Sequence, residues 1–404
     1  MYFLHGVHIV LPLIVFPYLV RVLGVENFGI VAFSLAFMGY FSLVVNYGFD
    51  LGSTRDISIN RNDRQELNKI FSATLYLKLI FLFACFILMV VLAKYVDSLN
   101  KYFDIFLMAY GVVVGLALMP QWLFQGLERL VIPALVGVMT KLLYLVLIFI
   151  FVKTTSDYDN VVIINSLSAI LNGILGLYLA HKLLEVKFVR VPKLFLMRTL
   201  KNNWDLFISK VSISVYSISA VFILGIFTTE SQVGIYAAAE KIIRAIQGLL
   251  NPISQAFFPQ MASDLNSQSR LLGLKKLLNV GLVTISAFFV ISLGVFVFST
   301  EIVKIILGSG YEQSVAVVKV LAFIPFIVAI SNFAGVQYML NSNMKTIYVT
   351  IIVIASILSI FLMLIAIPTY GYIGASYVLL FIETFVAIYM VGYVVFGYLK
   401  KNHL

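Results

Sequence analysis

Apolar runs of about 20 residues, the length that spans a bilayer as a helix, recur from one end of the chain to the other. Backbone groups in lipid must bond within the protein, so helices and closed barrels are the two spanning structures. The runs do not show the roughly 10-residue alternating segments of an outer-membrane barrel. We therefore predict an all-α integral membrane protein with about twelve transmembrane helices. The expected spans are 3–22, 28–49, 70–93, 102–124, 131–152, 160–181, 206–228, 233–259, 277–299, 314–340, 346–367 and 371–397.

The composition agrees with a membrane protein. Hydrophobic residues make up 62% of the chain, charged residues 11%, and the mean hydropathy is +1.04. The single cysteine, Cys85, lies in an apolar run and has no second thiol for an intramolecular disulfide or a metal site. The net charge of +10 does not indicate nucleic acid, because most of the cations lie in short loops beside apolar runs.

The distribution of Lys and Arg predicts the orientation of the chain. If both termini are cytoplasmic, the cytoplasmic loops and tail hold 17 of the 28 Lys and Arg residues, the opposite side holds five, and six lie inside spans. Such an excess of positive charge is typical of the cytoplasmic side. We therefore expect a multi-pass protein with both termini in the cytoplasm.

A basic segment near the middle of the chain, residues 181–201, has the character of a linker between two halves. Similar short segments open the second and eighth spans, where residues 26–32 read ENFGIVA and residues 231–237 read SQVGIYA. Their recurrence at equivalent places indicates duplicated halves, a plan of transporters that bind substrate where the repeats meet. We predict an N-terminal six-helix bundle over residues 1–190 and a C-terminal six-helix bundle over residues 191–404.

Several stretches carry a family resemblance. Residues 11–24 read LPLIVFPYLVRVLG and are followed by ENFG at 26–29, NYGF at 46–49 and TRDI at 54–57. In the second half, residues 236–247 read YAAAEKIIRAIQ and residues 252–256 read PISQA. Together these stretches resemble the Wzx-type O-antigen flippases, the lipid-linked oligosaccharide flippases of the polysaccharide transport family in the multidrug/oligosaccharidyl-lipid/polysaccharide (MOP) exporter superfamily. Members usually carry a longer basic tail before the first span.

The resemblance implies a function and a mechanism. Such proteins are V-shaped, MATE-like pairs of six-helix bundles that work by alternating access. They move undecaprenyl-pyrophosphate-linked O-antigen repeat units from the cytoplasmic to the periplasmic leaflet of the bacterial inner (cytoplasmic) membrane, a step of lipopolysaccharide biosynthesis. The implied partners are this lipid-linked oligosaccharide, the membrane lipids, the O-antigen polymerase and the chain-length regulator. The chain is then a transporter and not an enzyme.

The charges inside the predicted spans are mostly positive. A charge at the bilayer centre costs roughly 2.5–3.5 kcal/mol on insertion scales, so repeated cations indicate a use. Set against two acids, Glu240 and Glu383, the six cations leave +4 (6 − 2). We predict that these cations line a central cavity and bind the anionic substrate. The six are Lys78, Lys141, Lys210, Lys241, Arg244 and Lys319.

The eighth span has the clearest polar stripe. Its residues recur at helical spacing on one face, and they are Glu240, Arg244, Gln247, Asn251 and Gln255. The planar guanidinium of Arg244 suits phosphate oxygens. In the alternative interpretation, Glu240 and Arg244 form an i,i+4 pair that neutralises itself between helices. For Lys210 and Lys319, the alternative is that each side chain reaches toward the nearest membrane surface.

Three other charged residues are candidates for coupling or gating. Glu383, near the middle of the last span, is a candidate H⁺ or Na⁺ coupling site, the alternative being a charge partner for one of the lysines. Asp50 and Arg55 flank the cytoplasmic end of the second span as a candidate gate, the alternative being an ordinary loop pair.

The motifs argue against catalysis and against a bound cofactor. The sequence has no G-x-x-x-x-G-K-[ST] phosphate loop, no H-E-x-x-H and no paired Cys/His metal spacing. Two rival functions remain open. A cation-coupled multidrug exporter of the same superfamily predicts acidic cavity residues. A membrane polymerase or ligase acting on the same lipid carrier predicts a large periplasmic loop, whereas every expected periplasmic loop is short.

Overall fold

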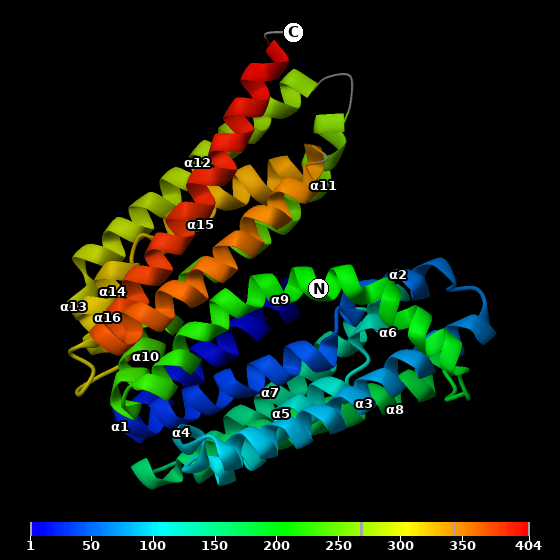
Figure 1. Ribbon diagram of the computed structural model, residues 1–404, viewed down its shortest axis with the longest axis horizontal. Coiled ribbons are helices and arrows are strands. Elements are labelled where there is room, and N and C mark those ends of the chain that lie inside the picture. Colours follow the sequence, from blue (N-terminus) through cyan, green and yellow to red (C-terminus); the bar gives the residue numbers. More distant parts are fainter. Residues whose placement is uncertain (1, 267–269, 343, 403–404) are drawn as a thin grey trace. The chain divides into compact units, whose positions relative to one another are not determined.

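The computed structural model describes residues 2–266, 270–342 and 344–402. Within those ranges the regular structure is helical, and no residue lies in a strand. Figure 1 shows long helices that run alongside one another within each half of the chain. The predicted all-α membrane fold is therefore confirmed.

The helices of the first half alternate long spans with short connecting turns. They are α1 Tyr2–Asn46, α2 Phe49–Ile59, α3 Arg64–Tyr95, α4 Asp97–Asn100, α5 Phe103–Leu118, α6 Gln121–Gly126, α7 Val131–Phe151, η1 Thr155–Asp157 and α8 Tyr158–Leu184. Helix α1 covers two predicted spans, and between them Gly24 takes a φ of 71° and interrupts the helical path. Helices α5 and α6 are separated at Pro120, which has no backbone N–H to continue the ladder.

The second half has the same character. Its helices are α9 Lys193–Phe227, α10 Glu230–Gly248, α11 Leu250–Asn266, α12 Arg270–Val297, α13 Ser299–Ile306, α14 Ser314–Leu321, α15 Ile324–Ser331, the π-helix η2 Asn332–Met339, η3 Leu340–Ser342 and α16 Lys345–Asn402. Helix α16 covers the last two predicted spans and bends at Gly371, whose φ is 54°. A Cβ there would lie 2.0 Å from Gln232 Oε1, so glycine is required both by the backbone and by its neighbour.

Each of the twelve predicted spans falls on one or more of these helices. Eight described segments are long and apolar enough to cross a membrane, and two of them, Leu11–Ile59 and Lys345–Phe396, each contain two predicted spans. Predicted span 206–228 lies almost entirely within the continuous helix α9. Predicted span 233–259 is more polar than the other spans, because it carries Glu240, Lys241 and Arg244. A span of that polarity needs protein or water beside it in place of lipid. Helices α10 and α11 are therefore suited to line a polar path.

The most apolar spans expose large hydrophobic side chains. Such exposure is expected of helices that face lipid. On α3 the exposed side chains include Ile80, Phe83, Ile87, Leu88 and Val91, and on α12 they include Leu278, Leu282, Val283, Val290 and Val297.

Small residues bring the helices of the first half together. A Cβ at Gly115 of α5 would lie 2.2 Å from the backbone of Ala169 on α8. On the same pair of helices, Ser166 Oγ donates to the carbonyl oxygen of Met108 at 2.6 Å. Close backbone approach with hydroxyl hydrogen bonds is the usual way in which helices pack inside a membrane.

The chain divides into two compact units, Met1–Ile218 and Ser219–Leu404. The division falls inside the continuous helix α9, whereas the sequence predicts a boundary at residue 190, in the segment before that helix. The first part of α9 thus packs with the six N-terminal spans. The reason lies in specific contacts with α2, which are described next.

Candidate functional site

Lys78 lies within α3 and has 1% of its surface exposed. Its ammonium donates to the carbonyl oxygen of Leu116 at 3.1 Å and lies 4.5 Å from the centre of the Trp122 ring. In a continuous helix that carbonyl would accept the N–H four residues later, but the residue there is Pro120. Lys78 therefore supplies the donor that the proline lacks, at a helix C-terminus where a cation is favoured. This placement gives Lys78 a structural role.

Asp50 on α2 holds Lys210 of α9. Lys210 Nζ lies 2.7 Å from Asp50 Oδ2, which also accepts from Asn46 Nδ2 at 2.7 Å. The side chains of Lys210 and Asp50 are 32% and 28% exposed. Both lie near enough to Lys78 to act on its charge. Two cations and one carboxylate leave this group with a net charge of +1.

Arg55 has a different partner from the one its predicted role requires. Its guanidinium lies 3.2 Å from the carboxylate of the adjacent Asp56, on an exposed part of α2. The structure thus brings Asp50 to Lys210 and Arg55 to Asp56. A gate formed by Asp50 and Arg55 stays a prediction.

Two glycines explain how α9 comes so close to α2. A Cβ at Gly48 would lie 2.9 Å from the backbone nitrogen of Phe207, and a Cβ at Gly52 would lie 1.5 Å from Asn203 Oδ1. Small residues four positions apart let two helices approach closely. Tyr47 also stacks on Phe207, with ring centroids 4.6 Å apart. Sequence reasoning missed this contact, although the Gly48 and Gly52 spacing is a signal for it.

Lys141 on α7 lines a pocket of about 200 Å³ within the first unit. The pocket lies among α1, α7 and α8, and its polar lining also includes Tyr144, Asn165 and Ser168. Ser168 Oγ donates to the carbonyl oxygen of Thr140 at 2.8 Å, which fixes α8 against α7 at this level. Lys141 is thus a predicted cation that lines a pocket within one unit.

Arg244 on α10 is held by Glu240 one helical turn earlier. Its Nε and Nη2 atoms lie 2.9 and 2.6 Å from Glu240 Oε1, as the i,i+4 spacing leads one to expect. Glu240 is 7% exposed, and Glu383 of α16, which lies near enough to act on the charge of Arg244, is 8% exposed. Arg244 thus stands with two carboxylates near enough to offset its charge.

The remaining predicted cations are exposed. Lys241 lies on α10 and Lys319 in the last turn of α14. Their binding roles stay predictions, as do those of the other predicted cations. Among the described residues, no group of three or more His, Cys, Asp or Glu side chains is placed to hold a metal ion.

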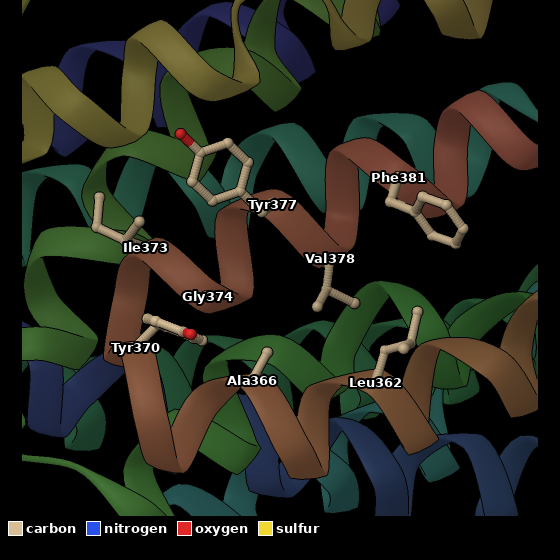
Figure 2. A pocket seen from close by; sticks show the side chains of 8 residues that line it. All are labelled: Leu362, Ala366, Tyr370, Ile373, Gly374, Tyr377, Val378 and Phe381. Carbon is tan, nitrogen blue, oxygen red and sulfur yellow. The ribbon is translucent and has the colours of Figure 1, made fainter.

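The second unit has an apolar pocket of about 520 Å³ at the bend of α16. Figure 2 shows Leu362 and Ala366 on the arm before the bend, and Val378 and Phe381 on the arm after it. Such a predominantly apolar lining suits a hydrocarbon chain.

Comparison with known proteins identifies the relatives of this chain. The family described as "Polysaccharide biosynthesis protein" matches residues 2–264. A protein of Escherichia coli (strain K12) named "Putative O-antigen transporter" is 34% identical over 391 residues, which cover 96% of this chain and 94% of that protein.

Solved structures show the same fold. The "Lipid II flippase MurJ, inward closed conformation" aligns with a TM-score of 0.80 at 15% identity, covering 97% of this chain and 87% of the other. An inward-facing "multidrug resistance MATE family transporter of the MOP superfamily" aligns with a TM-score of 0.71 at 14% identity, covering 98% of this chain and 96% of the other. At this identity the likeness establishes the fold alone.

Proposed function

Because this chain belongs to the polysaccharide biosynthesis protein family, we propose that it moves a lipid-linked oligosaccharide from the cytoplasmic to the periplasmic leaflet of a bacterial inner membrane. The observation that carries the proposal is the similarity over 96% of the chain to a protein named for O-antigen transport. The relatives are named as transporters, which is in line with movement of a substrate and not with its chemical conversion.

The carrier of the oligosaccharide in this proposal is undecaprenyl pyrophosphate, and the repeat unit is an O-antigen unit. Such a substrate has a long apolar tail that stays in lipid and a charged, hydroxyl-rich head that must cross the hydrocarbon core. The head needs a polar surface along its route, since an unsolvated charge in lipid costs several kcal/mol or more. Helices α10 and α11, which form the most polar of the predicted spans, supply polar and basic side chains for such a surface.

Alternating access of the two units is the mechanism that we propose. Release of the head on the far side requires that binding be weakened there, and a coupling ion is one way to weaken it. Glu383 is our candidate for H⁺ or Na⁺ coupling, since it is a buried carboxylate within electrostatic range of Arg244. An ion bound at Glu383 would offset its negative charge and strengthen the hold of Arg244 on an anion, and loss of that ion would weaken this hold again. We expect delivery of the product to the O-antigen polymerase and its chain-length regulator.

Deletion of the gene tests the proposal. Cells that lack the protein should accumulate undecaprenyl-linked repeat units on the cytoplasmic leaflet and lose O antigen from the surface, and a plasmid copy should reverse both effects. Arg244→Ala should prevent reversal while the protein still inserts, and Lys304→Ala, at an exposed lysine of α13, should permit it.

Two results would contradict this function. Normal surface O antigen in the deletion strain would remove the flippase assignment. Loss of resistance to organic cations without accumulation of lipid-linked sugar would favour the multidrug exporter instead.

A further inference from the structure

The pocket around Lys141 lies midway along the candidate membrane span α7. Lys141 is ten residues from each end of α7 (Val131–Phe151), which places it about 15 Å from either end at 1.5 Å per residue. Asn165 and Ser168 are seven and ten residues from the start of α8, which returns alongside α7. The Ser168 to Thr140 hydrogen bond confirms that the two helices meet at this depth.

Depth decides between the two ordinary explanations of a membrane lysine. A four-carbon stem lets a lysine near the end of a span reach the interface. A lysine at the centre of α7 is too far from either end for that, so its ammonium must be solvated where it is. The pocket that Lys141 lines also presents the Tyr144 hydroxyl and the Asn165 amide, and its volume of about 200 Å³ is room for several waters or one small polar group.

The lining of the pocket favours an oxyanion. Lys141 contributes three N–H donors, Asn165 contributes an amide and Tyr144 a hydroxyl. Three donors on one ammonium let it hold a protein acceptor and a ligand oxygen at the same time. The seven lining residues include one cation, Lys141, and no carboxylate. Tyr144, Asn165 and Ser168 are polar, and the remaining three, Leu11, Pro12 and Val15, are apolar.

The balance of charge sets this pocket apart from the Arg244 group. Two carboxylates lie near enough to Arg244 to offset its charge, so an incoming anion there meets no excess of positive charge. The pocket lining carries one positive charge. One charge and a small volume fit a single phosphoryl group better than a whole pyrophosphate or an oligosaccharide, for which pockets of about 300–1,000 Å³ are usual.

We propose that the α1–α7–α8 pocket is an oxyanion subsite in which Lys141, Asn165 and Tyr144 hold one phosphoryl group of a polyprenyl pyrophosphate as the head passes the membrane centre. The inference rests on the proposed function, which supplies the phosphorylated lipid. It adds the place of the phosphoryl group and the residues that recognise it. The second phosphoryl group and the sugars lie outside the pocket.

Binding by the purified full-length protein in lipid nanodiscs tests the subsite. The probes are undecaprenyl pyrophosphate, undecaprenol as the uncharged match, and free glucuronic acid as a carboxylate. Lys141→Met should weaken the pyrophosphate about ten- to a hundredfold, the range for losing one charge-assisted hydrogen bond. It should leave undecaprenol binding unchanged. Lys141→Arg should recover most of the loss, and Lys304→Met, at an exposed lysine of α13, should bind as the unaltered protein does.

The outcomes separate the subsite from the function. Equal pyrophosphate affinity of Lys141→Met and the unaltered protein overturns the subsite, even where that variant fails to restore O antigen. A variant that loses glucuronic acid but keeps pyrophosphate also overturns it, because Lys141 would then read a sugar carboxylate. If Lys141→Met does not fold, Tyr144→Phe provides the test. Its affinity for undecaprenyl pyrophosphate should fall severalfold, and an unchanged affinity would contradict the subsite. Failure of the unaltered gene to restore transport defeats the proposed function whatever the binding results.

Discussion

Replacing Gly52 with alanine probes how closely α9 rests on α2. The new Cβ would lie 1.5 Å from Oδ1 and 2.6 Å from Cγ of Asn203, a residue with none of its surface exposed. Asn203 must then move and give up the hydrogen bond from its Nδ2 to the carbonyl oxygen of Thr199, 2.7 Å away. Overpacking costs about 1–3 kcal/mol and a lost hydrogen bond about 1 kcal/mol. We expect Gly52→Ala to reduce the free energy of unfolding by about 2–4 kcal/mol.

The assay is thermal unfolding of the purified protein in detergent. For a unit of this size, the loss corresponds to a Tm lowered by about 4–16 °C. Adding Asn203→Ala removes the side chain that the new methyl group strikes, so the double variant should recover most of the Tm. Gly294→Ala is the control, because its Cβ would meet nothing within 4 Å. A Gly52→Ala protein that melts like Gly294→Ala, or a double variant without recovery, would refute the described contact.

Three further predictions concern the helix breaks and the orientation. Lys78→Met should lower the Tm, because the Leu116 carbonyl loses its donor. Adding Pro120→Ala to that variant should restore part of the loss by returning a backbone N–H. Equal Tm values for Lys78→Met with and without Pro120→Ala would contradict this. Gly371→Ala should cost at least about 1–2 kcal/mol of stability from its positive φ alone, so that Gln232→Ala relieves only part of the loss of Tm; full relief would rule out backbone strain. Reporter fusions after residues 190 and 270 should both report cytoplasm, and a periplasmic signal at either would overturn the orientation.

The spans could be predicted from the sequence because each is a local property. A run of about 20 apolar residues forms a helix in lipid whatever surrounds it. The bends at Gly24 and Gly371 and the break at Pro120 follow from residues that cannot continue a helix normally. The contact of Glu240 with Arg244 was predictable for the same reason, since residues four apart on a helix are neighbours.

Contacts between distant residues could not be predicted from spacing. Asp50 and Lys210 are separated by 160 positions, and Lys78 and Leu116 by 38. A sequence shows that these charges lie in apolar runs, but which partner satisfies each depends on how the helices pack. Arg244 shows the error in a charge count: it carries one of the six positive charges, but two acids offset it.

Transfer across a membrane of defined composition tests the central claim most directly. Undecaprenyl-pyrophosphate-linked oligosaccharide is placed in both leaflets of sealed vesicles, and an enzyme that cannot enter them removes the sugar from the outer leaflet. The account predicts that vesicles containing the protein lose the inner-leaflet share as well, whereas protein-free vesicles retain it. Retention of that share in vesicles with correctly folded protein, under every ion gradient applied, would contradict the account.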